Sequence, residues 1–396
     1  MRPLDGVRVL ELGNYMAGPF CGMLLGDLGA DVIKVENTRG GDYARALGPF
    51  PPGVPDGAGF VRMNRNKRSV ALDLKRPEAR DAFVALARRA DIIVENFRPG
   101  TMDDLGVGFA ILSHQNPRLV YVAISGFGAT GRHRDRPGLD LIVQAESGLM
   151  SITGEPDREP VKVGVPIGDL ASGMYGALGA LAALRQRERT GRGTFIDLAL
   201  LDAAVSLAVW ESGVFFTTRD VPERLGSAHR VDAPYQAFRT ADGSIVVGAT
   251  SPRTWQSFVE LTGLDELRRE EWSTPAKRRK RAGELAAIIE RATRKRSTEE
   301  WYVLLSHAGI PCGRIRGYDE VFTDEALIDR GMLVDLPDPD LGSVRSLGSP
   351  LRLGDEPAVL RRAAPRLGEH TREVLREIGY DDSAIDALSA GEASPA

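Results

Sequence analysis

The stretch VRVLELGNYMAGPFCGMLLGDLGADVIKVE (Val7–Glu36) decides the fold. It opens with a short apolar run at Val7–Leu10, continues through a Gly/Leu-rich segment at Pro19–Leu28 and closes with a second β-branched run at Asp31–Val35. Proline in the first turn is typical of a helix, so the stretch predicts a strand, a helix and a second strand. Such a unit is the repeating element of a parallel α/β sheet.

The same alternation continues along the first half of the chain. A helix is predicted at Glu78–Arg89, and further strands at Asp91–Val94 and Leu119–Ile124. Each predicted strand ends in polar or glycine residues, and ligands of open α/β sheets bind at the carboxyl ends of the strands. These loops are therefore the expected location of a site.

A second set of elements is predicted beyond residue 150. A strand-like stretch at Val161–Ile167 precedes an Ala/Leu-rich helix at about Ala171–Gln186, a strand at Phe195–Ala199 and a helical stretch at Leu200–Phe216. The periodicity then fades over residues 217–231, which predicts a linker.

A smaller unit is predicted after the linker. The Ser-x-x-Glu spacing from Ser297 to Glu300 indicates a capping box at the start of one of its helices. The elements predicted after the linker are a strand at Ile245–Val247 and helices near Thr254–Leu261, Glu284–Arg294, Ser297, Thr323–Arg330 and Thr371–Ile378.

Composition restricts the class of protein. A chain of 396 residues, 42% hydrophobic and 27% charged, is typical of a globular protein with more than one domain. The formal charge of −4 does not favour a nucleic-acid binder, and the basic run Lys277–Arg281 is predicted to be a solvated helix face. Because there is neither a long uninterrupted apolar segment nor a secretion signal, we expect no membrane association and a cytoplasmic location.

Several kinds of site are disfavoured by residue spacing. Gly13 and Gly18 have four residues between them, which does not fit the G-x-G-x-x-G fingerprint of dinucleotide sites. The five histidines lack metal-ligand spacing, and Cys21 and Cys312 are too few for a cysteine cluster or a disulfide framework. No G-x-S-x-G motif is present, so a carboxylate becomes the natural candidate for covalent chemistry, with neither a metal nor a tightly bound cofactor expected.

Asp169 is the leading candidate nucleophile. It stands in VPIGDLASG (Val165–Gly173), at a predicted strand-to-helix junction. An aspartate there can serve as a helix cap, and this alternative stays open on the local pattern. Glycines at 164, 168 and 173 would allow a ligand to approach the backbone, and the helix N-terminus is expected to keep the carboxylate ionised and to stabilise oxyanions.

The chain resembles the class III CoA-transferases, a family that includes formyl-CoA transferase, proteins of the CaiB/BaiF type and relatives of the α-methylacyl-CoA racemases. The resemblance spans nearly the whole chain, and its strength lies in the order of the matching segments. These are Ala17–Glu36, Asn66–Lys75, Val94–Gly106, Ser125–Gly131, Asp140–Gly154, Val165–Leu184, PYQAF (Pro234–Phe238), GIPCG (Gly309–Gly313) and LGEHTREVL (Leu367–Leu375).

The resemblance implies a mechanism and a set of contacts. Asp169 is then the catalytic residue, which forms a mixed anhydride with the acyl group and later a thioester with CoA, the co-substrate. The implied substrate pocket contains Asp140, Gln144, Glu146 and Gly168. Lys67, Arg68 and Arg98 are expected near the CoA phosphates, since each offers a cation near a strand end, and solvated surface charges are the open alternative. The further CoA contacts that the resemblance implies are Met16, Ala17, Leu72, Lys75, Asn96 and Phe97.

Three departures from formyl-CoA transferase make a formyl/oxalate substrate pair doubtful. Met16 replaces a glutamine, Asp104 replaces an arginine, and GATSPRTW (Gly248–Trp255) replaces a glycine-only loop. The donor is instead expected to be succinyl-CoA or a similar dicarboxylyl-CoA, whose second carboxylate would pair with arginines such as Arg39, Arg45 and Arg230.

Two alternatives remain. Racemases of this family carry a histidine before an aspartate, whereas this chain has Leu139 before Asp140, and leucine cannot abstract a proton. The other alternative is a non-catalytic CoA-binding homologue in which Asp169 only caps a helix.

The resemblance also implies an architecture. A large, doubly wound, Rossmann-like α/β domain is built from both chain ends, with a smaller central α/β domain, and two subunits interlock as a homodimer. The expected boundaries are 1–216 for the first part of the large domain, 217–231 for the linker, 232–325 for the small domain and 326–396 for the returning segment.

Overall fold

The computed structural model describes residues 2–354, 356–357 and 360–389, and the chain divides into two compact units. The larger unit contains Met1–Leu149, Lys162–Thr217 and Glu325–Ala396, and the smaller contains Met150–Val161 and Thr218–Asp324. The breaks after 217 and 324 lie one residue from the expected boundaries at 216 and 325. Two points differ: residues 150–161 group with the smaller unit, and so does the expected linker. Residues 390–396 of the returning segment lie outside the described part.

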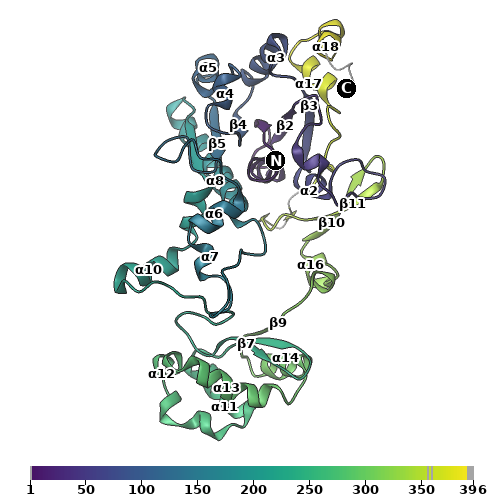
Figure 1. The fold of residues 1–396 in the computed structure, drawn as a ribbon. Helices are drawn as coiled ribbons and strands as arrows, with labels where there is room; N and C mark the ends of the chain where they lie inside the picture. Colours follow the sequence, from purple (N-terminus) through teal and green to yellow (C-terminus); the bar gives the residue numbers. More distant parts are fainter. Residues whose placement is uncertain (1, 355, 358–359, 390–396) are drawn as a thin grey trace. The chain divides into compact units, whose positions relative to one another are not determined.

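A parallel six-stranded sheet organises the larger unit, with the order β3-β2-β1-β4-β5-β6 (Figure 1). The order reverses between β1 and β4, and such a switch point is where doubly wound sheets bind ligands. The mixed α/β fold predicted from the sequence is therefore confirmed. The strands are β1 (Arg8–Leu12), β2 (Asp31–Glu36), β3 (Lys67–Ala71), β4 (Ile92–Glu95), β5 (Val120–Ser125) and β6 (Phe195–Ala199).

Helices cover both faces of this sheet. The stretch predicted as helical at Leu200–Phe216 is helical but divided, because the chain bends by 70° between α9 and α10. The helices of the larger unit are α1 (Ala17–Asp27), α2 (Ala58–Met63), α3 (Pro77–Ala87), α4 (Thr101–Asp104), α5 (Phe109–Gln115), α6 (Asp140–Glu146), α8 (Ile167–Thr190), α9 (Leu200–Ser206), α10 (Val209–Thr218), α16 (Glu325–Asp329), α17 (Thr371–Glu377) and α18 (Asp382–Ser389), with the short 3-10 helix η1 (Tyr43–Ala46) and, across a boundary of the units, α7 (Leu149–Ile152).

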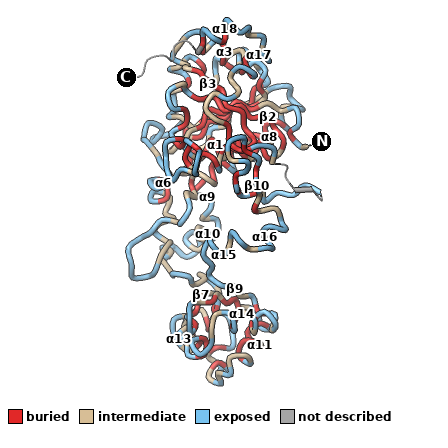
Figure 2. The backbone as a smooth tube through the Cα atoms, turned by 90° about the vertical axis from the view of Figure 1, so that its right-hand side faces the viewer, coloured by how far each residue is buried: buried red, intermediate tan, exposed pale blue. Residues whose placement is uncertain are grey.

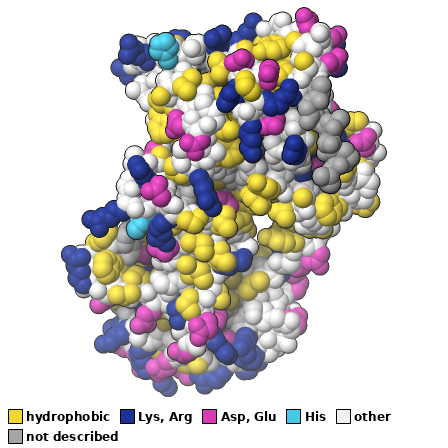
Figure 3. Space-filling model, turned by 45° about the horizontal axis from the view of Figure 1, so that its top comes forward, with side chains coloured by type: hydrophobic (Ala, Val, Ile, Leu, Met, Phe, Trp, Pro, Cys, Tyr) yellow, Lys and Arg dark blue, Asp and Glu magenta, His cyan; other side chains and the backbone are white. Residues whose placement is uncertain are grey.

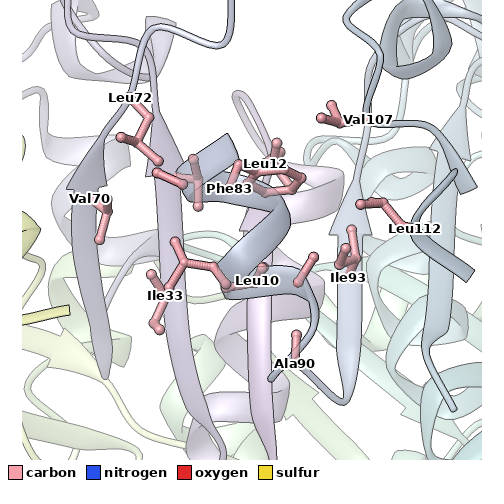
Figure 4. Packing of buried hydrophobic residues seen from close by; sticks show 14 of the residues in the cluster. Leu10, Leu12, Ile33, Val70, Leu72, Phe83, Ala90, Ile93, Val107 and Leu112 are labelled. Carbon is pink, nitrogen blue, oxygen red and sulfur yellow. The ribbon is translucent and has the colours of Figure 1, made fainter. Parts of the chain in front are cut away.

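Each buried strand contributes side chains to two hydrophobic cores, one on each face of the sheet, because successive side chains of a strand point to opposite faces. Leu10 and Ile33 join Phe83 of α3 in one cluster (Figure 4). Their neighbours Val9 and Val32 pack on the other face, against α1 and α8. The strands are accordingly red in the burial view, whereas many loops are pale blue (Figure 2). This double burial explains why the strands read as continuous apolar runs.

Two strand predictions need correction. The predicted strand at Val161–Ile167 is wrong: residues 161–166 are irregular, and the Val163 amide bonds to a side chain, Gln144 Oε1, at 2.9 Å. The edge strand β3 was not predicted, because its sequence KRSVA carries two charges and few apolar residues.

The C-terminal segment covers the edge of the sheet at β3. The amides of Gly368 and His370 donate to the Ser69 hydroxyl and carbonyl at 2.9 Å each. The Ala71 amide donates to Thr371 Oγ1 at 3.0 Å. The motif Leu367–Leu375 thus closes the exposed strand edge and ties the chain end to the larger unit.

The smaller unit is an antiparallel sheet packed on helices around buried Phe258, Trp272 and Trp301. Its predicted capping box is confirmed: the Glu300 amide donates to Ser297 Oγ, and the Ser297 amide donates to Glu300 Oε2. The elements of the smaller unit are β7 (Tyr235–Arg239), β8 (Ser244–Gly248), β9 (Cys312–Arg314), α11 (Pro252–Thr262), η2 (Asp265–Arg268), η3 (Glu270–Trp272), α12 (Pro275–Lys280), α13 (Ala282–Thr293), α14 (Thr298–His307) and α15 (Tyr318–Val321).

The larger unit also contains two antiparallel strand pairs. They are β10 (Leu333–Asp338) with β11 (Gly342–Leu347) and β12 (Arg352–Leu353) with β13 (Glu356–Pro357).

The basic run Lys277–Arg281 is only partly a solvated helix face. Arg278 is buried and donates to the carbonyls of Ala233, Trp272 and Thr250. Lys277 pairs with Glu270 at the surface. On the face drawn in Figure 3, basic and acidic side chains are interspersed.

Helix α8 packs closely against α1. A Cβ at Gly173 would lie 2.9 Å from the Ala17 carbonyl oxygen, and one at Gly176 would lie 3.1 Å from Cys21 Sγ. Within the described ranges, α8 is the one unbroken helix long and apolar enough to cross a membrane, and α9 with α10 passes that test only as a bent pair. Because Ala177 and Ala180 of α8 belong to the buried core beneath the sheet, we interpret it as a core helix.

Gly173→Ala should lower the free energy of unfolding by about 1–3 kcal/mol, because the added methyl group overpacks the contact with α1. Gly283→Ala is the matched control, since this helical glycine has no atom within 4 Å of a built Cβ. The control should leave stability unchanged or raise it slightly. Thermal unfolding of both variants measures the difference, and equal stability would contradict the proposed tight helix contact.

Candidate active site

Asp169 lies in the first turn of α8, and a different carboxylate caps that helix. Asp140 begins α6, and its Oδ1 accepts the Gly168 amide at 2.8 Å and the Asp169 amide at 3.4 Å. Among the described residues, no hydrogen bond or ion pair involves the Asp169 carboxylate, and the N-cap position of α8 is Pro166. The alternative that Asp169 serves as the helix cap is therefore wrong.

Gln144 fixes Asp140 in place. Its side chain is fully buried, and its Nε2 donates to Asp140 Oδ2 at 2.7 Å. Its Oε1 accepts the amide of Val163, in the segment that leads into α8. Asp140 and Gln144, both predicted for the substrate pocket, thus lie beside the candidate nucleophile and orient the start of its helix.

Burial and the neighbouring Asp140 carboxylate raise the pKa of Asp169 to about 7. The expectation that the helix N-terminus keeps this group well ionised is therefore corrected, because both effects oppose ionisation. Near neutral pH the carboxylate is still present in a large fraction of molecules, and it is more basic than an ordinary aspartate.

The backbone amides of the first turn of α8 are already occupied. Ile167 donates to the Val165 carbonyl at 2.8 Å, and Leu170 donates to the Pro166 carbonyl at 3.0 Å. The two amides between them donate to Asp140. The expectation that these amides stabilise oxyanions is not supported by this geometry.

Two of the three glycines near Asp169 allow close packing within the protein. A Cβ at Gly168 would lie 3.1 Å from Asp140 Oδ1, and one at Gly173 would meet Phe20 and Ala17 of α1. Only Gly164 has open space at its Cβ position. The expectation that all three make room for a ligand therefore holds at most for Gly164.

Glu146 is placed apart from Asp169. It lies six residues beyond Asp140 on α6, about 9 Å along the helix. Its side chain is exposed and pairs with Arg136 at 2.8 Å, which lowers the pKa of Glu146. The structure does not bring this predicted pocket residue into contact with the nucleophile.

A cavity of about 260 Å³ lies at the carboxyl ends of β1 to β4, next to the switch point of the sheet. Three residues predicted to contact CoA, Leu72, Lys75 and Phe97, lie in its wall. The cavity lies among the strand-end loops that were predicted to hold a site, although its other wall residues were not predicted individually. They are Leu12, Gly13, Asn14, Val35, Glu36, Asn37, Gly41, Asp42, Tyr43, Asp73, Leu74 and Leu105.

Other predicted CoA contacts hold the loops around this cavity. The Asn14 amide donates to Asn96 Oδ1 at 2.8 Å, and Asn96 Nδ2 donates to the Asn14 carbonyl at 2.9 Å. Asn96 thus joins the loops after β1 and β4. Met16 and Ala17 form the start of α1, where Ala17 is buried against α8 one helical turn from Asp169.

The predicted phosphate contacts at Lys67 and Arg68 need correction. Lys67 is fully buried, and its three donors bond to Glu11 Oε2, the Pro19 carbonyl and Asn64 Oδ1. Arg68 is held by carboxylates of Asp31, Glu373 and Glu377. Neither side chain is available to a phosphate.

The remaining predicted cations differ in their availability. Arg98 is exposed beside Phe97 and makes no ion pair among the described residues, so its guanidinium is available to bind a ligand. Arg45 is buried between Glu36 and Asp56, which corrects its expected role with a substrate carboxylate. Arg39 is exposed, two residues from Asn37 in the cavity wall. Arg230 belongs to the smaller unit.

A buried ion cluster beneath the cavity was not predicted from the sequence. Lys34 is fully buried and contacts Glu11 Oε1 at 2.9 Å, the Gly13 carbonyl at 2.6 Å and Asp42 Oδ2 at 2.9 Å. In the sequence, the cluster is indicated by two charged residues inside otherwise apolar strands, Glu11 and Lys34. This cluster fixes the loop that follows β1.

The described residues contain no group of three or more His, Cys, Asp or Glu side chains arranged to hold a metal ion. The site offers a buried carboxylate without a hydrogen-bond partner among the described residues, at Asp169, and a cavity at the strand ends. These features agree with the comparisons with known proteins.

A sequence model described as CoA-transferase family III matches residues 4–371. The mouse succinyl-CoA:glutarate CoA-transferase is 36% identical over 390 residues, which cover 98% of this chain and 89% of that protein. The succinyl-CoA:mesaconate CoA-transferase of Haloarcula marismortui is 38% identical over 389 residues, with 96% and 98% covered. A CaiB/BaiF family protein from Brucella suis has a similar crystal structure, with a TM-score of 0.86, 35% identity and 95% and 99% covered. The chain therefore belongs to CoA-transferase family III and is a class III CoA-transferase.

Proposed function

We propose that this enzyme moves CoA between carboxylic acids through covalent intermediates on Asp169, with succinyl-CoA or a similar dicarboxylyl-CoA as donor. The observation that carries the proposal is the Asp169 carboxylate itself, which makes no hydrogen bond or ion pair among the described residues. Its pKa of about 7 leaves a basic carboxylate at neutral pH. Asp140 satisfies the helix amides, so Asp169 is not needed as a cap.

The proposed reaction divides one exchange into balanced acyl transfers. The Asp169 carboxylate attacks the donor thioester, which forms a mixed anhydride and releases CoA thiolate. The thiolate attacks the aspartyl carbonyl, which forms an aspartyl-CoA thioester and releases the donor acid. The acceptor carboxylate attacks this thioester, which forms a second mixed anhydride and releases CoA thiolate. The thiolate then attacks the acceptor's carbonyl, which gives the new acyl-CoA and free Asp169.

The cavity at the strand ends is the proposed site for the nucleotide end of CoA. Its wall combines apolar side chains such as Leu72 and Phe97 with the cation of Lys75. Arg98 next to it offers a further exposed guanidinium for a phosphate.

Two observations support a dicarboxylic donor. The relatives at 36% and 38% identity are named as transferases of succinyl-CoA with glutarate or mesaconate. Arg39 is exposed close to the cavity wall and provides a cation for a second carboxylate. The racemase alternative lacks a base, since the side chain before Asp140 is the exposed Leu139.

A second copy of the chain is the proposed cover for a large apolar surface of the larger unit. Many large apolar side chains of its helices α6, α8, α9 and α10 are exposed, and exposed apolar patches mark interaction sites. Trp210 of α10 is 62% exposed, which a lone subunit would leave in water. This surface supports the interlocked homodimer as a proposal. Its exposed residues lie on α6, α8, α9 and α10 and in the loop before α6: Leu139, Leu141, Ile142, Met174, Tyr175, Leu178, Val205, Val209, Trp210 and Phe216.

Incubation with succinyl-CoA followed by hydroxylamine should leave a hydroxamate on Asp169, located by peptide mass spectrometry. Asp169→Asn should abolish the adduct and lower transfer by roughly a thousandfold or more, because the covalent route is lost. Asp135→Asn removes an exposed carboxylate before α6 and should behave as the wild type. An adduct on another residue, or unchanged transfer in Asp169→Asn, would contradict the proposal.

The kcat/KM of the wild type should fall as the pH drops through about 7, because protonation removes the nucleophile. Asp140→Asn removes the neighbouring charge, so the pKa of Asp169 should fall and the inflection should move about 0.5–1 pH unit lower. Asp135→Asn should leave the inflection in place. Initial rates across pH provide the test. An inflection at the same pH in Asp140→Asn as in the wild type would show that the Asp140 charge does not raise the pKa of Asp169.

Leu178→Glu places a charge in the exposed apolar surface of α8, where the side chain is 61% exposed. We expect it to convert a dimer to monomers or to weaken dimerisation at least tenfold, because the charge would be buried without a partner. Ile111→Glu makes the same change at an exposed position of α5 and should not alter the mass. Sedimentation of both variants tests this, and a wild type that sediments as a monomer would refute the dimer.

A further inference from the structure

Two exposed aromatic rings stand at the mouth of the cavity. Tyr15 lies in the loop after β1, and Tyr43 is the first residue of η1 and part of the cavity wall. Their rings stack with centroids 5.7 Å apart and planes at 22°. They remain 48% and 64% exposed, so the stack presents apolar surface to solvent next to the site.

The backbone beneath the rings is held by a buried carboxylate. Asp42 Oδ1 accepts the Tyr15 amide at 3.0 Å and the Ala44 amide at 2.9 Å. Its other oxygen pairs with Lys34 at 2.9 Å. Tyr15 is kept in the left-handed region, with φ of +60°, which non-glycine residues adopt uncommonly. The carboxylate of one buried ion pair therefore holds the backbone at Tyr15 and next to Tyr43.

The loop that carries Tyr15 connects the cavity wall to the helix that packs near Asp169. Asn14 is in the cavity wall, and Tyr15 follows it directly. Two residues later, Ala17 packs against Gly173 of α8, which is one helical turn, about 6 Å, from Asp169. This loop is therefore the part of the chain that links the cavity to the helix of Asp169.

We propose that Tyr15 and Tyr43 form a platform that binds the pantetheine arm of CoA, an inference that rests on the proposed function. The arm consists of methylene groups and two uncharged amides, which pack well on aromatic faces. The stack carries no cation and therefore does not suit the phosphates. The rings thus contribute to affinity for the arm without touching the reacting atoms.

The test compares the binding of CoA with that of adenosine 3′,5′-bisphosphate, which retains the nucleotide end but lacks the arm. Tyr43→Ala removes one ring, and Tyr15→Asn removes the other with a residue that tolerates the left-handed backbone. Tyr43→Phe and Tyr15→Phe keep the rings and are the matched controls. Calorimetry on the full-length protein gives the dissociation constants.

The platform predicts CoA binding weakened about five- to tenfold in Tyr43→Ala and in Tyr15→Asn, with the bisphosphate and both Phe variants unchanged. Equal weakening for both ligands would show a nucleotide contact instead, and no weakening for either would also overturn the platform. Because the readout is binding, it is separate from transfer: a protein that binds CoA in this way but does not exchange succinyl-CoA would refute the proposed function alone.

Discussion

The close contact between α1 and α8 is the constraint on which the site depends. Gly173 leaves room for the Ala17 carbonyl, so the helix that carries Asp169 meets the start of the helix that follows β1. The sheet places the loop after β1 at its switch point, beside the cavity. A side chain at Gly173 would push the two helices apart and move Asp169 away from the loop after β1. The position of Asp169 therefore depends on the absence of a side chain at residue 173.

Much of the fold could be predicted from the sequence, because buried parallel strands have a strong apolar signature. Asp31–Glu36 and Phe195–Ala199 are within one residue of their predicted bounds. The edge strand Lys67–Ala71 was missed because its sequence KRSVA is largely polar, although it pairs in parallel with Asp31–Glu36. The irregular stretch before α8 has strand-like residues but no neighbouring strand to pair with. Whether such a neighbour is present depends on the tertiary structure, which the local sequence does not determine.

The site was predictable to a lesser extent. Asp169 stood out through its motif, but its pKa depends on burial and on Asp140, which is distant in sequence. Lys67 resembles a phosphate ligand in sequence, yet it belongs to a buried ion cluster. Glu146 was predicted for the substrate pocket, yet it pairs with Arg136. In each case the residue type was informative, whereas its partner followed from three-dimensional contacts that local pattern does not encode.

Oxygen transfer into Asp169 tests the central claim most directly. When the acceptor acid carries ¹⁸O in its carboxylate, the proposed route leaves one acceptor oxygen on Asp169 as the new acyl-CoA forms. Peptide mass spectrometry after turnover should therefore find ¹⁸O in Asp169 and none in Asp140. Transfer that proceeds while Asp169 stays unlabelled would show that its carboxylate forms no anhydride with the acceptor, and the account of the reaction would be wrong.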